Sequence, residues 1–231
     1  MTDIAAIVFD KDGTLFDFEA TWGAWSRGLL ADLARDDADL TARLAGALGY
    51  DLAAGRFLRT STVIAGTVSE VADALLPHLP GRAKAELVAE LDAAAQRAPQ
   101  VGAVDLPQYL ASLRAAGLRL GVATNDSEAS ARVHLAKAGV EEMFDFIAGY
   151  DSGFGAKPAP GQLLAFAASV GVAPGRIAMV GDSRHDLAAA RAAGMQALAV
   201  LTGPARRDEL ETAADLVFDD IGALLPWLGL R

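Results

Sequence analysis

The chain has 231 residues, of which 52% are hydrophobic and none is cysteine. A chain of this length and composition can bury a sizeable core and is not generally disordered, and without cysteine it has no disulfide, thiolate metal site or cysteine nucleophile. Thirty acidic residues against twenty basic ones give a formal net charge of −10, which argues against broad nucleic-acid or anionic-membrane surfaces and leaves a small anionic substrate open.

The first predicted element is a strand at residues 4–9, whose side chains are all apolar. An unbroken apolar run suits the centre of a parallel sheet that is covered on both faces. Asp10 and Asp12 follow this strand directly, at the end where such sheets place their chemistry. The two carboxylates repel each other unless a cation lies between them, and Mg²⁺ takes one or two carboxylates and shares its other positions with phosphate and water. An acidic turn without chemistry is the alternative interpretation.

Residues 18–98 are predicted to form an all-helical insertion. Apolar residues recur there at helical spacing, and no buried strand is predicted. The tract at residues 55–62 is the most polar and basic part of this insertion. Its residues Arg59 and Ser61 are candidate contacts for a carboxylate or hydroxyl group of a substrate, and an exposed helical position is the alternative for Arg59.

From residue 104 onward, predicted strands and helices alternate. This alternation predicts an α/β fold with a doubly wound parallel sheet, which is a Rossmann-like arrangement. The predicted core consists of residues 1–17 and 99–231, and the helical cap is inserted at 18–98. The predicted helices cover residues 106–116, 127–138, 162–170, 187–193 and 221–228. The predicted strands cover residues 118–123, 146–148, 177–180, 197–201 and 216–218.

Polar residues follow the strand predicted at 118–123. Thr124 offers a hydroxyl group, and the next helix offers free amides at its amino terminus, so Thr124 and Asn125 are candidate phosphate contacts. Asp126 or Ser127 is expected to cap that helix.

Two later loops carry further candidates. Lys157 lies beside a proline in a glycine-rich loop without the nucleotide P-loop pattern, and it is either a solvated surface lysine or a compact positive charge for phosphate. Asp182 ends the strand predicted at 177–180, and Asp186 follows one helical turn later on the same side. Helix capping explains either acid alone. Because parallel strands end at one edge, Asp182 and Asp186 are expected near Asp10, where they would complete a cation site of oxygen ligands.

Four motifs resemble, in this order, those of the haloacid dehalogenase-like hydrolase superfamily: Asp10-Lys11-Asp12-Gly13-Thr14, Thr124-Asn125, Lys157-Pro158, and Gly181-Asp182 with Asp186. The resemblance covers essentially the whole chain, and a helical insertion after the first motif is similar to the cap of the phosphoglycolate phosphatase-like branch. Lys11 departs from the apolar or aromatic residue common in relatives. Pairing with a neighbouring acid and an effect on substrate access are both open for it.

The resemblance implies a phosphatase that works through an aspartyl-phosphate intermediate. Asp10 would be the nucleophile, and Asp12 would protonate the leaving oxygen and then accept a proton from water. Mg²⁺ would be held by Asp10, the Asp12 carbonyl and Asp182, with support from Asp186.

Thr124 and Lys157 would hold the phosphoryl oxygens of a small phosphorylated metabolite. A sugar phosphomutase shares all four motifs and is an alternative, and a non-catalytic phosphate-binding module is a less favoured one. No nucleic-acid or membrane partner is expected, and the oligomeric state is open. Because no segment reads as a signal peptide or a membrane span, we expect a cytoplasmic protein.

Overall fold

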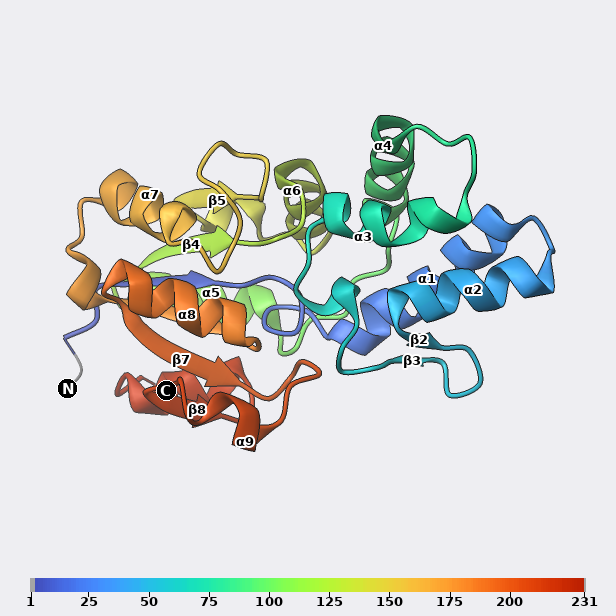
Figure 1. Cartoon of the computed structure of the whole chain (residues 1–231). Helices are drawn as coiled ribbons and strands as arrows, with labels where there is room; N and C mark the ends of the chain where they lie inside the picture. The colour runs from blue at the N-terminus through green and yellow to red at the C-terminus, as the bar shows by residue number, and fades with distance from the viewer. Residues whose placement is uncertain (1–2, 231) are drawn as a thin grey trace.

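The structure is a computed structural model that describes residues 3–230. Its centre is a sheet of parallel strands in the order β5-β4-β1-β6-β7-β8, flanked by helices (Figure 1). This arrangement confirms the predicted doubly wound sheet and places β1 in its interior, between β4 and β6. The strands are β1 (Ala6–Phe9), β4 (Arg119–Ala123), β5 (Phe146–Ala148), β6 (Ile177–Gly181), β7 (Gln196–Val200) and β8 (Leu216–Phe218).

Alternate side chains of β1 enter two different hydrophobic clusters. Ile7 and Phe9 pack with α5, α6 and α10, whereas Ala6 and Val8 pack with α7, α8 and α9 on the other face. None of the helices within the described residues is long and apolar enough to cross a membrane. The core helices are α5 (Leu106–Ala115), α6 (Glu128–Lys137), α7 (Gly161–Val170), α8 (Arg184–Ala193), α9 (Arg207–Leu210) and α10 (Leu224–Trp227).

The helical cap has a hydrophobic cluster of its own, which draws its buried residues from Phe18 to Ala98. The clusters on the two faces of the sheet contain none of these residues. Separate clusters support the proposal that 18–98 is a cap inserted into a core of 1–17 and 99–231. The cap helices are α1 (Phe18–Ala34), α2 (Ala38–Leu48), α3 (Val68–Leu75) and α4 (Lys84–Ala95), with short 3₁₀ turns at Thr62–Ile64 and Leu76–His78.

The cap also contains a short hairpin that the sequence analysis did not predict. Its two-residue strands, β2 (Tyr50–Asp51) and β3 (Arg56–Phe57), pair antiparallel. The turn forms because the Asp51 carboxylate accepts hydrogen bonds from two backbone amides within it, and because Gly55 takes a positive φ of 66°. The rings of Tyr50 and Phe57 pack edge to face, 5.1 Å apart, which buries one side of the hairpin.

The chain crosses between core and cap twice, and the two crossings run side by side. Phe16 and Gly102 form an antiparallel bridge. The Asp17 amide donates to the Val101 carbonyl at 2.8 Å, and the Ala103 amide donates to the Leu15 carbonyl at 2.9 Å. The two connections are therefore joined to each other at the base of the cap.

Candidate active site

Asp10 and Asp182 meet at the carboxyl edge of the sheet. Asp10 follows β1 and Asp182 follows β6, and these strands pair with Phe9 beside Val180. The Asp10 amide continues the pairing by donating a 2.8 Å hydrogen bond to the Val180 carbonyl. Two acids that lie far apart in the sequence are thereby brought to one edge.

Three buried carboxylates form what we call the acid cluster: Asp10, Asp182 and Asp186 each place an oxygen within 4.8 Å of the other two. Burial raises the pKa of Asp10 to about 7, and the charges of Asp186 and Asp12 add to this rise against the opposing charge of Lys157. Burial and the neighbouring acids also raise the pKa of Asp182 well above its usual range. The acid cluster therefore favours the approach of positive charge.

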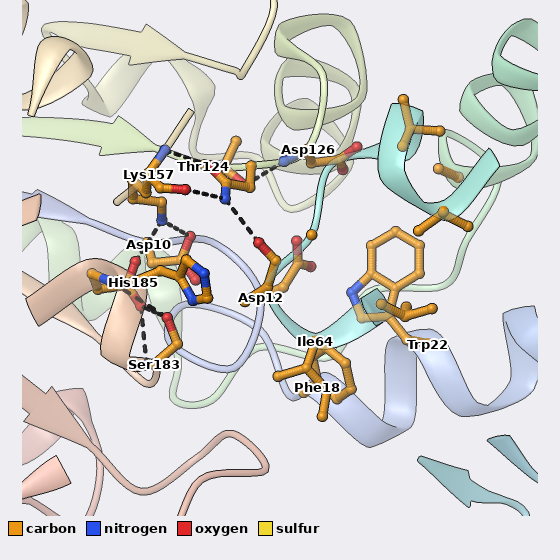
Figure 2. A pocket seen from close by; sticks show the side chains of 18 of the residues that line it. Asp10, Asp12, Phe18, Trp22, Ile64, Thr124, Asp126, Lys157, Ser183 and His185 are labelled. Carbon is orange, nitrogen blue, oxygen red and sulfur yellow. Dashed lines mark hydrogen bonds and ion pairs between the residues drawn. The ribbon is translucent and has the colours of Figure 1, made fainter. Parts of the chain in front are cut away.

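Lys157 supplies one positive charge to the acid cluster. Its Nζ lies 2.6 Å from an oxygen of Asp10 and 2.6 Å from an oxygen of Asp186. Burial alone would lower the pKa of Lys157, but the two carboxylates raise it above its usual range. Figure 2 shows its side chain pointing toward Asp10. Because only 4% of the residue is exposed, Lys157 is not a solvated surface lysine.

Asp182 has the least satisfied oxygen of the acid cluster. Within residues 3–230 its Oδ2 is buried and has no hydrogen-bond partner. Two glycines lie against this oxygen: an added Cβ would be 2.5 Å from Oδ2 at Gly13 and 1.7 Å from it at Gly203. A buried, unpartnered carboxylate oxygen beside two other acids fits a divalent cation, which prefers oxygen ligands. The residues present therefore suit the predicted kind of metal site.

The start of α8 orients Asp186. Ser183 donates to Asp186 Oδ2 through its amide at 3.0 Å and its hydroxyl at 2.6 Å, while Ser183 Oγ accepts from the Asp186 amide at 3.4 Å. This reciprocal capping box leaves Asp186 Oδ1 for Lys157. Asp186 is thus both a helix cap and a member of the acid cluster.

Thr124 and Asn125 follow β4 and face a cavity between core and cap. The Thr124 hydroxyl accepts a 3.1 Å hydrogen bond from the Asp126 amide. Asn125 Nδ2 donates to the carbonyls of Ala65 in the cap and Lys157 in the core, at 2.8 and 2.9 Å, and Oδ1 accepts from the Lys157 amide at 2.8 Å. The Asn125 side chain therefore fastens the Lys157 loop to the cap, with both amide hydrogens used by protein carbonyls.

A second buried charged group surrounds Lys11, which is 0% exposed. Its Nζ lies 2.7 Å from Asp12 and 3.2 Å from Asp126. It also lies 2.9 Å from Nδ1 of His134. Because an ammonium group only donates, Nδ1 accepts and Nε2 carries the proton that bonds the Ala95 carbonyl at 2.9 Å. Of the two roles left open for Lys11, the structure shows pairing with neighbouring acids.

Arg59 and Ser61, the predicted substrate contacts of the cap, are not brought to the cavity. Arg59 is exposed and pairs with Glu209 of the core at 3.1 Å. The buried Ser61 hydroxyl donates to the Leu48 carbonyl and accepts from the Val63 amide, so it caps the short turn that follows. Both residues were predicted from their polarity alone. In the structure, Arg59 uses its charge for an ion pair between cap and core, and Ser61 uses its hydroxyl to cap the 3₁₀ turn.

The core side of the cavity is polar and contains the remaining predicted residues except Asp182, which belongs to the acid cluster but does not line the cavity. Figure 2 shows Asp10, Asp12, Thr124 and Lys157 around the same space. The core residues that line it are Asp10, Asp12, Thr124, Asn125, Asp126, Lys157, Ser183, His185 and Asp186.

A model of the family described as haloacid dehalogenase-like hydrolase matches residues 4–194. The chain belongs to this family. Among curated relatives, the phosphoglycolate phosphatase of Rhodospirillum rubrum is 39% identical to this chain over 134 residues, which is 57% of the chain and 56% of the relative. The chain thus spans about half the length of the curated relatives it matches. The resemblance to the phosphoglycolate phosphatase-like branch is confirmed.

Solved structures share the fold of this chain over nearly its whole length. CbbY from Rhodobacter sphaeroides, solved in complex with phosphate, is 25% identical with a TM-score of 0.69, and the match covers 96% of each chain. The β-phosphoglucomutase of Clostridium difficile is 19% identical with a TM-score of 0.66, over 98% of this chain and 96% of that one. The likeness to the second protein concerns the fold alone.

Several residues that build the site were not predicted from the sequence. Gln162 is fully buried and donates a 3.1 Å hydrogen bond to the Thr124 carbonyl. Ser183 could have been found from its spacing to the acid three residues later, which is the capping-box pattern. His134 and Gly203 had no local signal, because their partners lie far away in the sequence.

We expect His134 to make stability depend on pH. Burial and the charge of Lys11 lower the pKa of His134 to about 4, so the folded state holds a neutral ring. In the unfolded chain the pKa of His134 is about 6.5, so above this pH the neutral ring contributes fully to the free energy of unfolding. As the pH falls from about 6.5 toward 4, the unfolded chain takes up a proton that the folded state does not, and the free energy of unfolding drops by up to about 3 kcal/mol. Urea unfolding of the wild type and His134→Gln at pH 7.5, 6 and 4.5 should show the wild-type advantage shrinking with acidification. If the free energies of unfolding of the two proteins changed in parallel with pH, a neutral His134 ring in the folded state would be contradicted.

Gly203→Ala should weaken cation binding more than it weakens the fold. The new Cβ would lie 1.7 Å from Asp182 Oδ2, so that carboxylate would have to leave its position in the acid cluster. We expect the affinity for Mg²⁺, measured by calorimetric titration, to fall at least about tenfold while the circular dichroism spectrum is kept. Gly175→Ala is the matched control, because an added Cβ there meets nothing within 4 Å. Equal Mg²⁺ affinities of both variants and the wild type would refute the role of Gly203.

Proposed function

We propose that this protein is a Mg²⁺-dependent phosphatase that hydrolyses a small phosphomonoester through an aspartyl-phosphate intermediate on Asp10. The observation that carries the proposal is the acid cluster itself. Three buried carboxylates converge within 4.8 Å, and two of them, Asp10 and Asp186, bind Lys157 and line a cavity between core and cap. Such an arrangement can attract a dianionic phosphate group only when a cation and nearby donors offset the acids.

In the proposed first step, an Asp10 carboxylate oxygen attacks phosphorus. The bond from phosphorus to the ester oxygen breaks as the bond to Asp10 forms, and Asp12 gives a proton to the departing alkoxide. Lys157 and the Thr124 hydroxyl donate to the phosphoryl oxygens, where negative charge develops. The buried position of Lys157 supports this role, because a charge that is shielded from water acts more strongly.

In the proposed second step, Asp12 takes a proton from a water molecule that attacks the phosphorus of the intermediate. The acyl-phosphate bond breaks, inorganic phosphate leaves, and Asp10 returns as a carboxylate. A Mg²⁺ ion, held by Asp10, the Asp12 carbonyl and Asp182 with support from Asp186, would lower the repulsion between the nucleophile and the phosphate. The ion pair with Lys11 supports a fixed position for the Asp12 carboxylate beside the cavity.

The proposed class of substrate rests on the named relatives and on the net charge of the chain. The relatives named as phosphoglycolate phosphatases and the phosphate complex of CbbY support a small phosphorylated metabolite. The net charge of −10 supports the proposal that nucleic acid is not the partner. The cytoplasm is the proposed location.

Asp10→Asn should abolish turnover and keep the fold. The amide has no free carboxylate electron pair for attack on phosphorus, so we expect kcat to fall by at least about a thousandfold. Phosphate release is measured from a panel of small phosphomonoesters, with and without Mg²⁺. Asp208→Asn, an exposed acid outside the cavity, is the matched control and should keep wild-type rates. Appreciable turnover by Asp10→Asn would remove this residue as the nucleophile.

The affinity for Mg²⁺ should rise with pH. A raised pKa of about 7 means that Asp10 holds a proton at pH 6 and has lost it at pH 8, and a cation must displace that proton. We expect the affinity to increase about tenfold between pH 6 and 8, with about one proton released per ion at pH 6. Calorimetry in buffers of different ionisation enthalpy measures both quantities.

The Asp10→Asn variant is the control for this titration, because its amide does not ionise. It should bind Mg²⁺ more weakly and with a flatter pH dependence. A wild-type affinity that is the same at both pH values, without proton release, would show that Asp10 is ionised before the cation arrives.

A further inference from the structure

The side chains on the cap side of the cavity are apolar, apart from the indole N–H groups of Trp22 and Trp25. Figure 2 shows Phe18, Trp22 and Ile64 on the side of the cavity away from Asp10 and Lys157. We call this surface the cap wall. Its residues are Phe18, Trp22, Trp25, Val63, Ile64, Ala65, Gly66, Val68, Val71, Leu91 and Ala95.

The cap wall continues the hydrophobic core of the cap. Phe18 and Leu91 are buried members of that core, whereas Trp25, Ile64 and Val68 pack against it and remain partly exposed. These last side chains give the cavity an apolar surface that a ligand can cover. A substrate whose phosphate reaches Asp10 would place the rest of its structure against this wall.

No charged, hydroxyl or amide side chain belongs to the cap wall within the described residues. The cap does contain arginines and lysines, and all of them lie outside the cavity. Arg59 pairs with Glu209, Arg82 with Glu90, and Lys84 with Asp73. Arg27, Arg35, Arg43, Arg56 and Arg97 are exposed.

On the basis of the proposed phosphatase function, we propose that the substrate is a short-chain alkyl phosphomonoester, with an apolar leaving group against the cap wall. A second anionic group, such as the carboxylate of phosphoglycolate, would lose its hydration there without gaining a cation. Among the described residues of the cap wall, the hydroxyl groups of a sugar would find two indole N–H donors, those of Trp22 and Trp25, and no side-chain acceptor. A cavity volume of about 80 Å³ limits the leaving group to a few carbon atoms beside the phosphate.

The sharpest test compares two esters of the same shape. In isobutyl phosphate and in 2-phosphoglycolate the leaving group is a primary alkoxide. The branch of the first ester carries two methyl groups, and the branch of the second carries two carboxylate oxygens. We expect kcat/KM, measured with Mg²⁺, to be at least tenfold higher for isobutyl phosphate. Along ethyl, propyl and butyl phosphate, kcat/KM should rise about fourfold for each methylene until the cavity is filled.

A variant with a charge in the cap wall should reverse the preference. Ile64→Arg places a cation opposite the acid cluster and should raise the ratio of 2-phosphoglycolate to isobutyl phosphate activity at least tenfold. Leu58→Arg adds the same charge at a cap residue that is 51% exposed and outside the cavity, and it should leave the ratio unchanged. Circular dichroism checks that both variants fold, and the wild-type comparison stands without them.

The outcomes separate this inference from the proposed function. Phosphate release with 2-phosphoglycolate or a sugar phosphate preferred would overturn the apolar substrate class and leave the phosphatase standing. No release from any ester would count against the phosphatase, and calorimetric binding of the same two esters to the Mg²⁺-loaded wild type would then decide. Tighter binding of isobutyl phosphate would support the apolar class, and equal, weaker or absent binding would overturn it.

Discussion

The repulsion among buried carboxylates at one edge of the sheet is the constraint on which the rest of the site depends. Asp10, Asp182 and Asp186 converge because parallel strands end there, and burial makes their joint ionisation costly. Lys157 offsets two of the charges, and Ser183 orients one of the carboxylates. The surrounding loops can be understood as means of holding like charges together.

Two buried lysines each pair with two acids of the site. Lys157 pairs with Asp10 and Asp186, whereas Lys11 pairs with Asp12 and Asp126. In the proposed mechanism this division separates the nucleophile from the acid–base group, although the two are only one residue apart in sequence. A buried cation beside each group lets neighbouring carboxylates differ in role, because each has its own electrostatic surroundings.

The parts of the site that could be predicted from sequence are those that follow from sheet geometry. An unbroken apolar strand followed by Asp10, and a second one followed by Asp182, define an edge without any knowledge of side-chain contacts. The contact of Lys11 with His134 spans 123 residues and has no periodicity to reveal it. Arg59 was assigned by polarity, but where a loop residue points depends on tertiary partners such as Glu209, which polarity does not identify.

The bridged pair of connections beneath the cap limits how the two halves can move. Because Phe16 and Gly102 are paired, the two crossings cannot slide past each other or stretch independently, so separation of cap and core is a swing about one axis. Asn125 spans the gap from the core to Ala65, and a swing that opens the cavity must break this bond. The same amide holds the Lys157 loop through two bonds that stay within the core, so the cap can swing away while Lys157 keeps its place beside Asp10.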